Sequence, residues 1–176
     1  MKRICLFPGT FDPVTLGHID IIDRSLDLFD KVVIGIGKNA SKIPMFPDEL
    51  RLEWLNDIYR NEPRVEAIAY EGLTADCCKS IRAKFIVRGI RYVSDFEYEK
   101  AIADMNRSLD PTIETIFLTC LPKYTSVAST LVRDVLRNGG DVDQFIPKEV
   151  LHSLKQFAMV SNVKNKPTAI LKKSIQ

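Results

Sequence analysis

Residues 9–18, Gly9-Thr10-Phe11-Asp12-Pro13-Val14-Thr15-Leu16-Gly17-His18, join a short apolar run to an amphipathic one. The run before them, residues 4–7, is continuously apolar, which is typical of a strand buried on both faces. Gly9 and Gly17 permit close backbone approach, and Pro13 cannot continue either element. The apolar residues that follow recur at the spacing of a helix of about three turns: Ile19, Ile22, Leu26 and Phe29.

A tight turn from a buried strand into a helix is where α/β proteins bind phosphate, because free N–H groups and the positive end of the helix dipole meet there. His18 stands in the first turn of the predicted helix, so its imidazole can face the same anion. An isolated histidine at a helix start is more often an ordinary surface residue. Its combination with Thr10 and the glycine turn favours a functional role.

Alternation of apolar runs and amphipathic stretches continues to residue 159 and predicts an α/β fold: a single doubly wound, Rossmann-like parallel sheet with helices on both faces. We expect strands at residues 4–7, 31–36, 65–69, 85–87 and 113–118. After the first helix, we expect further helices at residues 48–59, 73–82, 95–107, 129–137 and 147–159.

Composition indicates one soluble domain, which we place at residues 1–160 of the 176, because no apolar run is long enough to span a bilayer. Residues 161–176 form a lysine-rich tail that we expect to be poorly ordered and solvated rather than an RNA-binding arm. The net charge is +2, and without the four lysines that follow Ser161 it is −2. A near-neutral body argues against nucleic acid as a partner, and we expect no membrane partner.

The four cysteines include no CxxC pair, which favours reduced thiols and a cytoplasmic location. The start of the chain carries no signal-peptide pattern. With two histidines and no Cys/His cluster, we expect no metal held by protein ligands. No GxxxxGK[ST] motif occurs, and the GxGxxA pattern at residues 35–40 precedes a proline-containing loop rather than a helix.

Ligands of doubly wound sheets bind at the carboxyl ends of the strands, so the segments after each strand deserve scrutiny. After the second strand comes Ser41-Lys42-Ile43-Pro44-Met45-Phe46. A lone loop lysine is usually solvated, but Pro44 and the two apolar residues after it restrict this loop. Lys42 is therefore a candidate point charge for a phosphate.

The fourth strand runs into Arg88-Gly89-Ile90-Arg91 and then Asp95-Phe96-Glu97-Tyr98-Glu99. Two arginines around a glycine place two cations at one strand end. They are candidates for binding phosphate, or they pair with the acids of the second segment in ordinary ion pairs.

Hydroxyl side chains gather between the fifth strand and the next helix, in residues 124–133. Ser129 or Thr130 could simply cap that helix, since such residues are preferred there. Alternatively, the same hydroxyls and the free N–H groups of the helix start bind phosphate.

The stretch Thr15-Leu16-Gly17-His18 resembles the (H/T)xGH signature of the nucleotidylyltransferase superfamily. The segment at 41–46 and the RGIR and DFEYE segments are similar to those of the phosphopantetheine adenylyltransferases, and the resemblance covers roughly residues 1–158. It implies a reversible transfer of an adenylyl group from ATP to 4′-phosphopantetheine, giving dephospho-coenzyme A and pyrophosphate in coenzyme A biosynthesis. It also implies Mg²⁺ bound with ATP, a homohexamer and feedback by coenzyme A.

The resemblance also assigns roles residue by residue. It implies that the catalytic residues are His18, Thr10, Lys42 and Arg88, and that the acceptor is bound by Thr10, Lys42, Thr74 and Arg88. For ATP it implies Thr10, Phe11, His18, Gly89, Ile90, Arg91, Glu99, Tyr124, Thr125, Ser126, Val127, Ala128, Ser129 and Thr130. Ala128 departs from the family pattern, which has a serine there, so one hydroxyl contact is missing.

Two other classes of function stay open at this point. One is a different small-molecule nucleotidylyltransferase, such as a cytidylyltransferase or a nicotinate-mononucleotide adenylyltransferase. The other is a non-catalytic nucleotide-binding or RNA-binding module, which Ala128 and the basic tail would favour.

Overall fold

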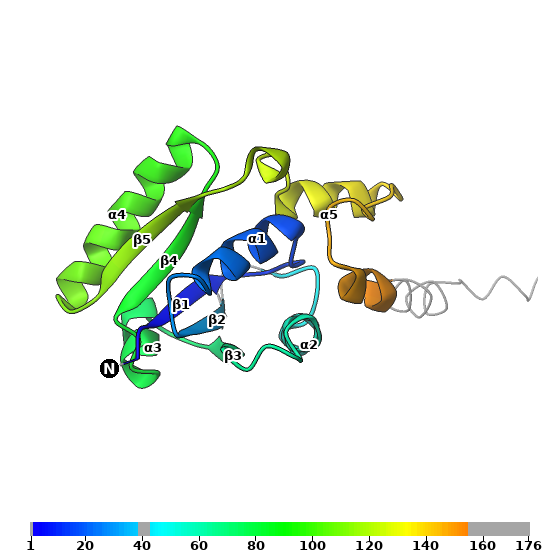
Figure 1. Cartoon of the computed structure of the whole chain (residues 1–176). Helices are drawn as coiled ribbons and strands as arrows, with labels where there is room; N and C mark the ends of the chain where they lie inside the picture. The colour runs from blue at the N-terminus through cyan, green and yellow to red at the C-terminus, as the bar shows by residue number, and fades with distance from the viewer. Residues whose placement is uncertain (1, 39–42, 155–176) are drawn as a thin grey trace, which may run out of the picture.

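The computed structural model describes residues 2–38 and 43–154, which build a five-stranded sheet flanked by helices (Figure 1). The strands pair in parallel in the order β3-β2-β1-β4-β5. Their bounds are β1 (Ile4–Gly9), β2 (Lys31–Gly37), β3 (Val65–Tyr70), β4 (Phe85–Ile90) and β5 (Glu114–Thr119). The strand order reverses between β1 and β4, and in doubly wound sheets ligands bind at this switch point. The expected fold class is confirmed.

Helices cover both faces of the sheet, as predicted. Their bounds are α1 (Leu16–Ser25), α2 (Asp48–Ile58), α3 (Thr74–Ser80), α4 (Val93–Leu109) and α5 (Ser129–Arg137), with a short 3₁₀ turn η1 (Pro122–Tyr124) before α5. Residues 148–154 are also helical, where the last helix was expected. No helix in the described part of the chain is long and apolar enough to cross a membrane.

Consecutive residues of the central strands point into two separate cores, because side chains alternate along a strand. Cys5 of β1 belongs to a core that includes residues of α1, α2 and α5, whereas Leu6 belongs to a second core on the α3 side of the sheet. Helix α4 lies on the α3 side of the sheet, where the ring of Phe96 packs edge-on against Phe117 of β5 with centroids 5.4 Å apart. Both faces of the central strands are thereby buried.

Two details differ from the sequence expectation. Strands β3 and β5 are half-buried rather than fully buried, because they form the two edges of the sheet. The apolar stripe of the first helix extends past its end, since α1 stops at Ser25 and both Leu26 and Phe29 follow it. Phe29 is nevertheless buried in the same core. The expected tail at 161–176 lies outside the described residues.

Candidate active site

The turn between β1 and α1 is held in a strained conformation by aromatic packing. Phe11 has a φ of +49°, in the left-handed region that residues other than glycine rarely adopt. Its buried ring packs edge-on against His18, with centroids 5.0 Å apart, and against Phe7 at 5.6 Å. A Cβ added at Gly9 would lie 3.0 Å from this ring, so a larger residue there would have to displace the ring. The conformation of the turn therefore depends on the packing of Phe11.

His18 presents a defined hydrogen-bond donor at the start of α1. Its Nδ1 lies 3.0 Å from the backbone nitrogen of Thr15, whose N–H can only donate. In a neutral imidazole, Nδ1 must then be the acceptor and the proton must reside on Nε2. The hydroxyl of Thr15 is also 3.0 Å from Nδ1. This arrangement leaves the Nε2–H group as the donor of the ring.

The electrostatic surroundings keep this imidazole neutral. Burial, together with the charges of Arg91 and Arg88, lowers the pKa of His18 from 6.5 to about 4. The Nε2–H group of His18 is therefore an uncharged donor at neutral pH.

This lowered pKa predicts a pH dependence of stability. Between pH 6.5 and about pH 4 the unfolded chain binds a proton at His18 that the folded chain does not, so the free energy of unfolding decreases as the pH falls. We expect the free energy of unfolding of His18→Gln, measured with urea, to decrease less steeply than that of the wild type over this pH range. An NMR titration that found the His18 imidazole protonated near pH 6.5 would contradict the assignment.

The predicted nucleotide-binding residues surround a cavity of about 280 Å³ at the carboxyl edge of the sheet, at the switch point. Its walls come from the ends of β1 and β4, the start of α1 and the start of α5. The residues predicted from the sequence that line it are Thr10, Phe11, His18, Arg88, Gly89, Arg91, Glu99, Tyr124, Val127, Ala128, Ser129 and Thr130.

A second cavity of about 670 Å³ adjoins the first. It is lined by Thr74, whose hydroxyl lies 3.0 Å from that of Tyr70, and by Asn106 of α4. Both cavities share a wall, formed by Pro8, Gly9, Thr10, Arg88 and Glu99. Two ligands can therefore bind side by side, with the shared wall at their junction.

Both arginines of the RGIR segment are paired with acids of α4. The Nε of Arg88 donates to Glu99 at 2.7 Å, a second nitrogen donates to the other oxygen of the same carboxylate, and the third donates to the carbonyl of Pro8. Arg91 pairs with Asp95 at 3.2 Å. The ion-pair interpretation is thus correct. Because both arginines also line the nucleotide cavity, these ion pairs keep two guanidinium groups at its edge.

The start of α5 faces the same cavity without a side-chain cap. Ala128 is the N-cap residue, so the interpretation of Ser129 or Thr130 as capping residues is wrong. The Ser129 hydroxyl instead donates to the carbonyl of Pro13 at 2.8 Å, which ties α5 to the turn after β1. The first N–H groups of α5 therefore have no side-chain cap from Ala128, and such a helix start favours anions.

Comparisons with known proteins agree with this geometry. A family model described as cytidylyltransferase-like matches residues 6–135. The chain is 51% identical over 148 residues to the phosphopantetheine adenylyltransferase of Flavobacterium psychrophilum, covering 84% of this chain and 97% of that protein. It is 42% identical over 149 residues to the enzyme of the same name from Lachnoclostridium phytofermentans, covering 85% and 91%. The chain belongs to the phosphopantetheine adenylyltransferase family.

A third relative of that name, from Bacteroides thetaiotaomicron, is 48% identical over 146 residues, which cover 83% of this chain and 96% of the relative. Membership in this family confirms the branch that the segments at 41–46 and 88–99 indicated. It favours that branch over the cytidylyltransferase and nicotinate-mononucleotide alternatives.

Some predicted site residues do not line either cavity. Ile90, Thr125 and Ser126 are absent from both linings, and Lys42 lies outside the described residues. Conversely, no motif in the sequence pointed to Tyr70 and Asn106, which line the second cavity. Tyr70 ends β3, so a search of every strand end would have found it. Asn106 lies in the last turn of α4, where no local pattern distinguishes it.

Proposed function

We propose that this chain transfers the adenylyl group of ATP to 4′-phosphopantetheine and releases dephospho-coenzyme A and pyrophosphate, in a reversible step of coenzyme A biosynthesis. One observation carries the proposal: two adjoining cavities share a wall that contains Thr10 and Arg88, and the His18 ring lines one of them. Such a pair of sites suits a reaction that joins two phosphorylated ligands. The family membership supports the same reaction.

The chemistry requires positioning rather than a nucleophilic side chain. The acceptor phosphate is itself the nucleophile: its oxygen bonds to the α-phosphorus of ATP, and the bond from that phosphorus to the β-phosphate oxygen breaks. The Nε2–H of His18 donates to an α-phosphate oxygen as negative charge develops there. Thr10, at the shared wall, orients the attacking and α-phosphates.

The cations reduce the electrostatic repulsion between the two anionic substrates. Arg88 binds the acceptor phosphate from the shared wall and exchanges its bonds to Glu99 for bonds to the ligand. Lys42 contributes a second charge to the acceptor. Arg91 and the start of α5 face the nucleotide phosphates.

Mg²⁺ enters this account as a companion of ATP. Within residues 2–38 and 43–154 no group of three or more His, Cys, Asp or Glu side chains could hold a metal ion. This donor set does not fit a resident metal. We therefore propose that Mg²⁺ arrives on the ATP phosphates, which are hard oxygen ligands that it prefers.

The four free cysteines support a reducing compartment, and we propose the cytoplasm. Burial raises the pKa of the Cys5 and Cys78 thiols to about 12, which keeps them protonated and inert.

We also propose feedback by coenzyme A. It contains the whole of the product dephospho-coenzyme A, so it can occupy the same two cavities and compete with both substrates. Inhibition by coenzyme A should weaken as the concentration of either substrate is raised.

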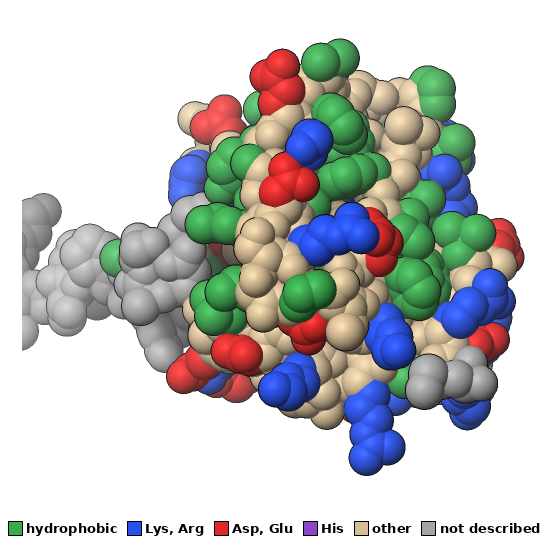
Figure 2. Space-filling model, turned by 90° about the vertical axis from the view of Figure 1, so that its left-hand side faces the viewer, with side chains coloured by type: hydrophobic (Ala, Val, Ile, Leu, Met, Phe, Trp, Pro, Cys, Tyr) green, Lys and Arg blue, Asp and Glu red, His purple; other side chains and the backbone are tan. Residues whose placement is uncertain are grey.

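A homohexamer is the proposed assembly, and the surface of α4 supports an interface. Several large apolar side chains of this helix and its N-cap residue are exposed: Tyr92, Val93, Phe96, Tyr98, Met105 and Leu109. Figure 2 looks at the molecule from the side on which α4 and β5 lie in Figure 1, and hydrophobic side chains alternate with charged ones there. Among them, Tyr98, Met105 and Leu109 share one face of the helix, and exposed apolar surface of this kind marks interaction surfaces.

The interface proposal predicts the effect of adding charge to α4. Tyr98 and Met105 are 69% and 68% exposed and lie two turns apart on one face of the helix. We expect the double variant Tyr98→Asp/Met105→Asp to reduce the mass measured by light scattering to that of smaller species. A wild-type protein that is already monomeric, or a variant of unchanged mass, would contradict the proposal.

The reverse reaction tests the proposed function. Wild-type protein given dephospho-coenzyme A, pyrophosphate and Mg²⁺ should produce ATP, measured by a luciferase assay. The control replaces dephospho-coenzyme A by nicotinate adenine dinucleotide, which the alternative adenylyltransferase would cleave. ATP formed only from the control, or from neither compound, would contradict the proposal.

A further inference from the structure

Arg51 of α2 is a buried cation that the proposed mechanism does not use. Among residues 2–38 and 43–154 it is the only buried lysine or arginine, and its side chain is 3% exposed. A charge removed from water is costly unless its partners replace the lost hydration. The identity of those partners therefore indicates why a guanidinium is retained here.

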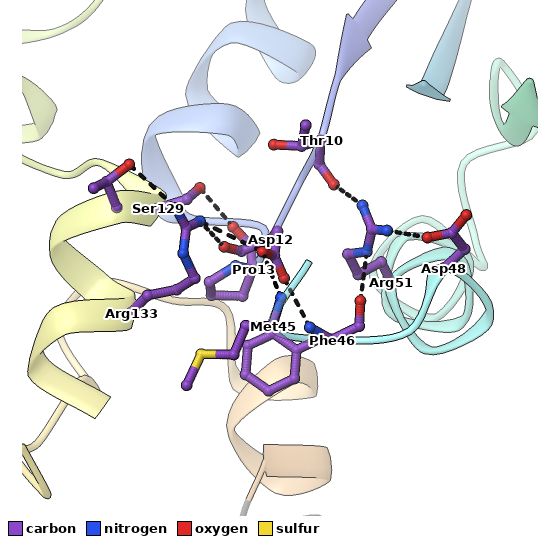
Figure 3. A network of polar contacts seen from close by, with 10 residues as sticks. Thr10, Asp12, Pro13, Met45, Phe46, Asp48, Arg51, Ser129 and Arg133 are labelled. Carbon is purple, nitrogen blue, oxygen red and sulfur yellow. Dashed lines mark hydrogen bonds and ion pairs between the residues drawn. The ribbon is translucent and has the colours of Figure 1, made fainter. Parts of the chain in front are cut away.

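The guanidinium joins the turn after β1 to the start of α2. Its Nε donates to the carbonyl of Phe46 at 3.0 Å, one terminal nitrogen donates to the carbonyl of Thr10, and the other binds the carboxylate of Asp48 (Figure 3). Only the planar fork of arginine offers donors in three such directions. Thr10 follows the last residue of β1, so its carbonyl lies beyond the sheet and takes this partner instead.

Asp12 anchors the same turn through both its carboxylate and its backbone carbonyl. Its carboxylate accepts from the backbone N–H groups of Met45 and Phe46 at 2.9 and 3.0 Å. Arg133 of α5 donates to the carbonyl of Asp12 and lies 3.6 Å from its carboxylate. The backbone from Thr10 to Asp12 is thereby fixed between α2 and α5, as Figure 3 shows.

This network fixes the backbone from which the Thr10 side chain projects. Figure 3 shows the Thr10 carbonyl turned toward Arg51 and its hydroxyl turned away. Thr10 lies in the wall that the two cavities share, where the two phosphates would meet. Misplacing a reacting group by about 1 Å can cost roughly two powers of ten in rate. Holding the carbonyl of Thr10 in place therefore limits how far its hydroxyl can be displaced.

We infer that Arg51 is a positioning residue for adenylyl transfer: it holds the carbonyl of Thr10 so that the Thr10 hydroxyl meets the reacting phosphates. Arg51 acts through Thr10, because its donors are occupied by the carbonyls of Phe46 and Thr10 and by the carboxylate of Asp48. The inference rests on the proposed function, because it assigns Thr10 its task.

A double-mutant cycle between Arg51 and Thr10 tests this inference. Arg51→Lys keeps the charge but loses the fork, and Thr10→Val removes the hydroxyl with little change of shape. We expect Arg51→Lys to lower kcat about tenfold or more in the Thr10 background, and by less than about twofold when Thr10→Val is already present. Arg60→Lys, on an exposed arginine just beyond α2 that pairs with Asp57, is the matched control and should leave kcat unchanged.

A merely structural role would give a different pattern. Arg51→Lys would then lower Tm while the folded protein kept its kcat, or it would lower kcat by the same factor in both Thr10 backgrounds, and either result would overturn the inference. Arg51→Gln provides the same cycle if the lysine variant does not accumulate as folded protein. Wild-type turnover in the same assay separates the two claims. An inactive wild type contradicts the proposed function and with it the role of Arg51, whereas an active wild type without coupling contradicts Arg51 alone.

Discussion

Replacing His18 by alanine is expected to lower kcat by about two to three powers of ten while the affinity for ATP stays nearly unchanged. The reason is that the Nε2–H donor serves the charge that develops on the α-phosphate in the transition state, and less so the bound ground state. Steady-state kinetics give kcat, and calorimetry gives the dissociation constant of ATP. His152→Ala is the control, because this exposed second histidine lines neither cavity.

Amide replacements test which nitrogen of the ring acts. The side-chain amide of glutamine reaches about as far as Nε2, whereas that of asparagine reaches only about as far as Nδ1. We expect His18→Gln to retain more activity than His18→Asn. Better function of the asparagine variant would contradict the assigned tautomer, and a loss of ATP affinity as large as the loss of kcat would contradict the role itself.

Arg88→Ala is expected to raise the KM for 4′-phosphopantetheine by about one to two powers of ten, since a hydrogen-bonded charge contributes roughly 1.5–3 kcal/mol. The variant also leaves the carboxylate of Glu99 without its bidentate partner beside the acceptor cavity, where it repels a phosphate. Steady-state kinetics with phosphopantetheine as the varied substrate measure this effect. Arg107→Ala is the control, since this arginine of α4 is exposed and pairs with Glu114.

The pairing of Arg88 with Glu99 adds a second expectation. Glu99→Gln in the Arg88→Ala background should recover part of the lost acceptor affinity, because it removes the unpaired charge. An unchanged KM for phosphopantetheine in Arg88→Ala would contradict the role of Arg88. No recovery in the double variant would contradict the repulsion.

Local patterns were sufficient to predict the scaffold and the turn at its centre. Apolar runs such as residues 4–7 and 31–36 predicted the strands, because strands buried on both faces need them. The glycines and Pro13 predicted the turn, and the position of His18 in the first helical turn followed from it. The carboxyl-edge rule then gathered Thr10, Arg88 and Ser129 around one cavity although they are far apart in sequence.

Other features depend on contacts that no local pattern contains. The grip of Arg51 on Thr10 joins residues 41 positions apart, and the bond from Arg133 to Asp12 joins residues 121 apart. The choice of Glu99 over Glu97 as the partner of Arg88 depends on which face α4 turns toward β4. Half-burial of β3 and β5 follows from their place at the edges, which only the strand order reveals.

The central claim is that two phosphorylated ligands react across the wall formed by Thr10 and Arg88. Pyrophosphate release tests it most directly, with ATP, Mg²⁺ and 4′-phosphopantetheine run beside CTP as donor and beside nicotinate mononucleotide and glycerol 3-phosphate as acceptors. The account predicts release only from ATP with 4′-phosphopantetheine, and its loss in His18→Ala. Release with another pair, or from none, would contradict it.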